Sequence, residues 1–121
     1  MINLDEREEL IKLFDNYSSL LTSKQKQYFE AYYYDDLSLA EIAAEFDVSR
    51  NAVFDQIKKT ISILKNYEEN LHQLRNKELL EKAYESNSVD EIKQLIAKII
   101  KEWYKWHLIH YQAVYKWHYV V

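Results

Sequence analysis

The chain has 121 residues and contains neither glycine nor proline. Sheet proteins rely on glycine and proline in their hairpin turns and bulges, where the backbone takes conformations that other residues disfavour. A sequence of this length without either residue is therefore predicted to be all helical. Because 48% of its residues are apolar and 30% are charged, the chain also has enough apolar material for one domain with a hydrophobic core.

Several classes of protein are disfavoured by what the sequence lacks. It has no cysteine, so it cannot form disulfides or use a thiol, and this suits a reducing compartment. The first ten residues, MINLDEREEL, are acidic and lack the apolar core of a signal peptide. The sequence contains no run of 18 or more uncharged apolar residues, the length that a membrane-spanning helix needs. The expected location is the cytoplasm.

Pairs of residues that form capping boxes mark the predicted helix starts. In such a box, a Ser, Thr or Asn side chain and a Glu or Gln three residues later satisfy two backbone N–H groups. The pairs are Asn3/Glu6, Thr22/Gln25, Ser38/Glu41 and Ser88/Glu91, and Ser49 is a further N-cap. Together with apolar periodicity they predict five helices, over 4–20, 23–34, 39–46, 50–84 and from 89 almost to the end.

The predicted organisation is one all-helical domain over residues 1–121. Residues 4–66 form a three- or four-helix unit with a helix-turn-helix, and residues 67–121 form a long helical hairpin that serves oligomerisation. The fourth helix, at about 1.5 Å per residue, is too long for a compact domain of this size to enclose. It is therefore expected to pack against the fifth helix, to kink, or to reach a second chain. The favoured arrangement is an antiparallel hairpin with the fifth helix and a dimer built on the same surface.

The segment SLAEIAAEFDVSRNAVFDQIKKT, residues 38–60, has the pattern of a helix-turn-helix. Its apolar positions predict contacts between two helices, and Ala43 is small where the helices would cross. Asp47 stands at the turn, where glycine is usual, and Asp takes a left-handed conformation more readily than most residues. The expected inward residues are Ile42, Phe46, Val48, Val53 and Ile57.

The outer face of the second of these helices is the candidate nucleic-acid site. Arginine can pair with guanine or phosphate and asparagine with adenine, whereas Phe54 and Asp55 are poor groove residues. Residues 1–70 hold 8 Lys and Arg against 14 Asp and Glu, a balance that does not favour duplex DNA. DNA contact and a purely structural packing role both stay open. The candidate DNA-binding residues are Arg50, Asn51, Phe54, Lys58 and Lys59.

Residues 21–71, LTSKQKQYFEAYYYDDLSLAEIAAEFDVSRNAVFDQIKKTISILKNYEENL, resemble two known groups. The LS..EIA and VSR..V motifs are distantly similar to region 4 of bacterial sigma factors, which reads promoters through a helix-turn-helix. The whole run is much more similar to the YlxM family of small bacterial helix-turn-helix proteins. Asp47 stands where that family usually has glycine.

The YlxM resemblance implies a sigma region 4-like fold and a role beside the signal recognition particle, because members are usually encoded next to its GTPase. It implies a non-enzymatic regulatory or accessory protein whose partners are the particle's GTPase or RNA. The alternative is a transcriptional regulator that binds specific duplex DNA through the helix-turn-helix.

The last third of the sequence is aromatic and has two candidate roles. YKWH occurs at 104–107 and again at 115–118, an offset of three helical turns. Apolar residues from Ile92 to Val120 also follow the 4–3 spacing of a coiled coil. The helix is predicted either to complete the chain's own core or to form a homodimer or higher oligomer. The candidate interface residues are Trp103, Trp106, Tyr111 and Trp117.

No catalytic or metal site is predicted. His107, His110 and His118 lie close together on a helix, but packed or solvated histidines are the default interpretation. A chain without glycine has no glycine-rich phosphate loop, and no nucleophile with a base is visible. We expect no enzyme activity, no cofactor and no metal.

Overall fold

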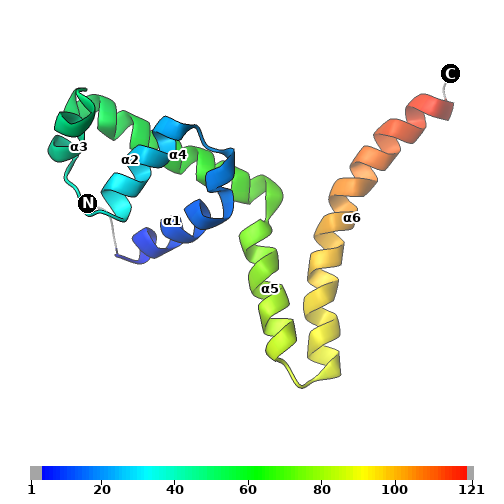
Figure 1. Ribbon diagram of the computed structural model, residues 1–121. Coiled ribbons are helices and arrows are strands. Elements are labelled where there is room, and N and C mark those ends of the chain that lie inside the picture. Colours follow the sequence, from blue (N-terminus) through cyan, green and yellow to red (C-terminus); the bar gives the residue numbers. More distant parts are fainter. Residues whose placement is uncertain (1–3, 120–121) are drawn as a thin grey trace. The chain divides into compact units, whose positions relative to one another are not determined.

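The computed structural model describes the backbone of residues 4–119 and the side chains of residues 6–103 and 105. The described backbone consists of helices joined by short loops, without a strand, which confirms the all-helical prediction (Figure 1). The elements are α1 (Leu4–Tyr17), the 3₁₀ turn η1 (Ser18–Leu20), α2 (Ser23–Tyr33), α3 (Leu39–Phe46), α4 (Arg50–Leu71), α5 (Gln73–Glu85) and α6 (Val89–Tyr119).

The chain divides into two compact units, which we call the N-terminal unit (Met1–Leu74) and the C-terminal unit (Arg75–Val121). The boundary lies just after α5 begins. The boundary expected at residues 66–67 falls inside α4. The single-domain organisation of the whole chain stays a prediction.

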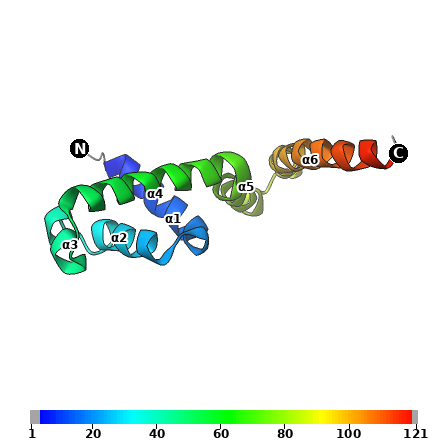
Figure 2. The ribbon, with the colours of Figure 1, turned by 90° about the horizontal axis from the view of Figure 1, so that it is seen from above.

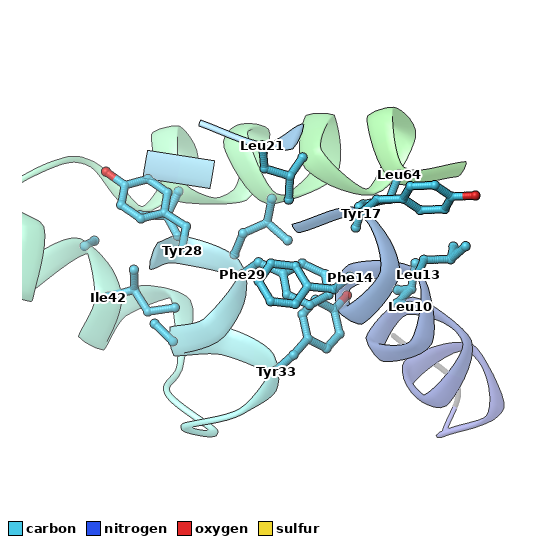
Figure 3. Packing of buried hydrophobic residues seen from close by; sticks show 14 residues of the cluster. Leu10, Leu13, Phe14, Tyr17, Leu21, Tyr28, Phe29, Tyr33, Ile42 and Leu64 are labelled. Atoms are coloured by element: carbon cyan, nitrogen blue, oxygen red, sulfur yellow. The ribbon is translucent and has the colours of Figure 1, made fainter. Parts of the chain in front are cut away.

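The core of the N-terminal unit forms where α1, α2 and α3 pack against α4 (Figure 2). Phe29 lies at its centre, fully buried, with its ring stacked on Phe14 at 4.4 Å between centroids and tilted against Tyr33 at 4.4 Å (Figure 3). The apolar residues that recur every three or four positions in the first helix and just after it are all buried: Leu10, Leu13, Phe14, Tyr17 and Leu21.

Local capping explains why most helix starts were predictable. The reciprocal boxes of Thr22/Gln25 and Ser38/Glu41 are present, and the Ser49 hydroxyl accepts a hydrogen bond from the Ala52 N–H at 3.0 Å. Asn3 of the predicted first box lies outside the described residues.

The predicted box at the start of α6 is only half formed. The Ser88 hydroxyl accepts from the Glu91 N–H at 3.3 Å, as expected. The Glu91 carboxylate, however, accepts from the Ser86 hydroxyl at 3.0 Å, and the Ser88 N–H donates to Ser86 Oγ at 3.1 Å. The Ser88 N–H is thus satisfied by the Ser86 hydroxyl, whereas in a complete capping box the Glu91 side chain would accept from it.

The prediction of one continuous helix over 50–84 is wrong. The helix stops at Leu71, and His72 adopts a left-handed conformation with φ 52° and ψ 28° before α5 begins at Gln73. A tertiary contact accounts for the break. Tyr17 of α1 donates to the Glu68 carboxylate at 2.5 Å, and its hydroxyl accepts from the Gln73 N–H at 3.0 Å. The same carboxylate accepts from the Leu74 N–H at 3.2 Å, so the first amides of α5 are satisfied from outside the helix.

Within the C-terminal unit, α5 and α6 form an antiparallel hairpin closed by residues 86–88, the loop that the sequence predicted (Figure 1). An ion pair between Arg75 Nη1 and Glu102 Oε1, at 3.5 Å, joins the two helices far from the loop. Within the described residues, no helix combines the length and the apolarity needed to cross a membrane.

Candidate functional site

The turn between α3 and α4 is built on Asp47. This residue has φ 53° and ψ 50°, which confirms the predicted left-handed conformation. The N–H groups of Asp47 and Val48 both donate to the Ala43 carbonyl, and this closes the end of α3. Ser49 then caps α4, so the chain reverses within three residues.

The inward side of this helix pair contacts the core, as predicted. Ile42, Val53 and Ile57 are buried, and Ala43 is buried where the helices cross. Phe46 is half-buried and meets the Tyr28 ring edge-on at 4.9 Å. The start of α4 is therefore held rigidly, and its outer side chains have a defined direction.

All the side chains predicted to project from α4 are exposed: Arg50, Asn51, Phe54, Asp55, Lys58 and Lys59. At about 100° per residue, they do not share one face. Arg50, Phe54 and Lys58 are four residues apart and form one row, with Asn51 beside it. Lys59 lies about 180° around the helix from Arg50. We call Arg50, Asn51, Phe54 and Lys58 the α4 outer face.

The electrostatic character of this region is mixed. Residues 38–60 hold three cations and four carboxylates, and the carboxylates are exposed: Glu41, Glu45, Asp47 and Asp55. Within the described residues, no ion pair involves Arg50 or Lys58. The α4 outer face thus presents two cations and an aromatic ring beside acidic neighbours, and it is not a uniformly basic strip.

Phe54 is the most unusual member of this face. Its side chain is 49% exposed although its ring is large and apolar, and its row neighbours Arg50 and Lys58 lie one turn away on either side. Aromatic and arginine side chains are the commonest anchors at protein interfaces. This arrangement is able to bind a macromolecule through one apolar and two cationic contacts.

Sequence reasoning missed the long-range polar contacts that hold α1 in place. One is the Tyr17–Glu68 pair described above. The other joins Arg7 to Asp36 at 2.6 Å, with a second bond from Arg7 to the Tyr33 carbonyl at 2.5 Å. Both link residues more than 25 positions apart, so no local pattern could reveal them. They join α1 to the end of α2, to the loop after it and to the end of α4, outside the candidate site.

The predicted oligomer residues are only partly described. Trp103 is 54% exposed on α6, whereas the side chains of Trp106, Tyr111 and Trp117 lie outside the described residues. The same holds for the three histidines considered as metal ligands. Among the side chains that the structure does describe, no group of three His, Cys, Asp or Glu could hold a metal ion.

The trihelical core, the tight left-handed turn and the exposed start of the following helix define a helix-turn-helix protein. Residues 4–104 match the family model of UPF0122, described as "Putative helix-turn-helix protein, YlxM / p13 like". The chain belongs to this family, which confirms the resemblance seen in the sequence.

Curated relatives cover most of the chain. It is 44% identical over 102 residues to the UPF0122 protein YofM of Lactococcus lactis, covering 81% of this chain and 90% of that protein. It is 48% identical over 108 residues to a UPF0122 protein of Mycoplasma capricolum, covering 85% and 94%. A UPF0122 protein of Bacillus cereus (strain AH187) is 50% identical over 96 residues, covering 78% and 82%.

Replacing the residue at the turn should change stability without touching the outer face. Asp47→Gly is expected to raise the free energy of unfolding by about 0.5–1 kcal/mol, because glycine adopts the left-handed region without the steric cost of a Cβ atom. Asp47→Ala should instead lower it by about 1 kcal/mol. Urea unfolding followed by circular dichroism measures both. A loss of stability in Asp47→Gly would mean that the carboxylate makes a stabilising contact of its own.

Proposed function

We propose that the protein is a non-enzymatic regulatory protein of the signal recognition particle pathway, which binds the particle's GTPase or RNA through the α4 outer face. The observation that carries the binding role is Phe54, an apolar ring half exposed at the centre of a row of cations. The pathway rests on the YlxM resemblance, whose members are usually encoded beside the particle's GTPase. Action on this particle would place the protein in the cytoplasm, where a cysteine-free chain is at no disadvantage.

The charge pattern supports the particle's GTPase over its RNA and over duplex DNA, since both nucleic acids carry a phosphate backbone. Phosphate-driven binding gains from every cation and loses from every nearby carboxylate. Glu41 and Glu45 of α3 and Asp55 of α4 are exposed within the helix-turn-helix and would oppose a phosphate backbone. A partner with a basic surface and an apolar pocket would fit both the carboxylates and Phe54.

Duplex DNA is the second candidate. Arg50, Asn51 and Lys58 are exposed on the first three turns of α4, and in a helix-turn-helix the N-terminal part of the second helix contacts base edges in the major groove. In that case Phe54 would contribute only apolar contact with a thymine methyl group. Regulation of transcription would follow from such binding.

The two candidates differ in which side chain matters and in their response to salt. We would titrate the protein against the labelled GTPase, the labelled particle RNA and a labelled DNA duplex, at low and at moderate salt, and follow fluorescence anisotropy. For the GTPase, Phe54→Ala is expected to weaken binding about 30-fold. Leu20→Ala, which shortens another exposed apolar side chain of the N-terminal unit, should leave it unchanged.

For duplex DNA the cationic side chains would matter more for affinity than Phe54. Arg50→Ala and Lys58→Ala would each weaken binding more than Phe54→Ala, and the affinity would fall steeply as salt rises. That result would replace the first candidate with the second. Failure to bind the GTPase or the RNA at tens of micromolar would overturn the proposed role in the pathway.

A further inference from the structure

The hairpin of α5 and α6 is held together by one inward row from each helix. The rows follow the three- and four-residue spacing of helix neighbours. Ala83 and Leu95 are the two buried side chains among the described residues from Arg75 onward, and the other members are half-buried. The inward residues are Asn76, Leu79 and Ala83 of α5 and Ile92, Leu95 and Ile99 of α6.

The residues that directly follow the inward ones make one side of the hairpin apolar. Each of them lies about 100° further around its helix than the inward residue before it. Because the two helices run in opposite directions, this rotation places the residues of both helices on the same side of the hairpin. Leu80 and Tyr84 of α5 are 52% and 93% exposed there, and Ile96 and Ile100 of α6 are 38% and 45% exposed. We call these four residues the apolar side of the hairpin.

The residues that directly precede the inward ones make the opposite side polar, and all of them are exposed. Arg75 is one of them, and its ion pair with Glu102 ties the two helices together on this side. The six residues are Arg75, Glu78, Lys82, Glu91, Gln94 and Lys98. The hairpin therefore has one charged side suited to water and one side of large apolar groups.

Two lysines complete the apolar side, and the exposed Glu81 lies beside Lys77 at its outer border. Lys77 follows Asn76, and Lys93 follows Ile92, so these two cations take the remaining positions on that side. A lysine can lay its aliphatic stem along an apolar surface while its ammonium group reaches water. Lys77 and Lys93 can thus border a buried contact without entering it.

We infer that a second copy of this chain covers the apolar side, so that two hairpins form a four-helix bundle. A two-helix hairpin is too small to enclose a core of its own. Units of this size are stabilised by disulfides, by a metal or by oligomerisation, and a chain without cysteine has no disulfide. Two identical apolar sides related by a two-fold axis bury each other's large side chains and form the commonest symmetric interface. The 4–3 apolar spacing of α6 continues in the sequence beyond Trp103, as expected of a helix that packs against others along its length.

The mass of the full chain in solution tests this inference. Sedimentation equilibrium at tens of micromolar should give twice the chain mass of 14.7 kDa. Ile96→Glu places a carboxylate in the apolar side and should weaken the dimer about 30-fold or more. Gln94→Glu adds the same charge two residues away on the polar side and should leave the dimer intact. Circular dichroism of both variants reports whether the helices persist.

A second measurement does not depend on a variant that weakens folding. Because the chain has no cysteine, Leu80→Cys and Glu78→Cys each accept a single nitroxide label. Electron–electron resonance should find a shorter distance between the two copies for the label on the apolar side. Equal distances would overturn the inference.

The remaining outcomes would overturn the inference. A wild-type protein that is monomeric at tens of micromolar overturns the inference, and so does a dimer that Ile96→Glu leaves intact. A monomer that binds vesicles of mixed phosphatidylcholine and phosphatidylglycerol would make the apolar side a membrane surface. The inference does not rest on the function proposed for α4, because loss of the dimer and loss of GTPase binding are measured separately.

Discussion

Phe29→Ala is expected to lower the free energy of unfolding by about 3–5 kcal/mol. The ring is fully buried between α1 and α2, stacked on Phe14 and in contact with Tyr33 (Figure 3). Its removal loses both aromatic contacts and leaves a cavity that the surrounding helices cannot fill. Small domains are stable by only about 5–15 kcal/mol, so the variant should unfold at a much lower urea concentration.

Phe54→Ala is the matched control, because it makes the same chemical change on a ring that is half exposed. Its stability should stay within about 0.5 kcal/mol of the wild type. Urea unfolding of the three proteins, followed by circular dichroism, measures the difference. Equal losses in the two variants would show that Phe29 is not at the centre of the core.

The second large effect is expected at the break between α4 and α5. Tyr17→Phe should lower the free energy of unfolding by about 1–3 kcal/mol, because it removes the donor to Glu68 and the acceptor of the Gln73 N–H at a buried position. Tyr28→Phe removes the same hydroxyl from another buried ring, one whose hydroxyl makes no hydrogen bond among the described residues, and it should cost much less. Urea unfolding near neutral pH measures both variants.

The same tyrosine makes stability depend on alkaline pH. Burial, and next the hydrogen bond to Glu68, raise the pKa of Tyr17 from 10.0 to about 12. Between these values the unfolded chain loses the proton while the folded protein keeps it, so stability falls from about pH 10 up to about pH 12. The fall should be shallower in Tyr17→Phe. It should not vanish, because Tyr33 and Tyr34 also have pKa values raised to about 12. An unchanged fall would exclude Tyr17 as a contributor.

The parts of the fold that the sequence predicted depend on local interactions. The start of α2 follows from the Thr22/Gln25 box and that of α3 from the Ser38/Glu41 box. The period of apolar residues correctly separated the buried side of α4, at Val53 and Ile57, from its exposed side. All of these signals lie within one or two helical turns.

The parts that escaped prediction depend on residues far apart. Nothing near His72 resembles a helix stop, since neither glycine nor proline is there, and the break is held by Tyr17, 51 positions before Glu68. At the candidate site, the contact of Phe46 with the ring of Tyr28, 18 positions earlier on α2, escaped prediction for the same reason. A single sequence does not show which residues far apart along the chain come into contact.

The capping of α5 by a tyrosine of α1 also sets an order of assembly. A fragment of residues 50–85 on its own lacks Tyr17, and its helix has no reason to stop at Leu71, so it should run straight through His72. The break is therefore expected to form only once the first helix has docked onto α4. The first helix, which is synthesised earliest, thus supplies the hydroxyl on which the start of α5 depends.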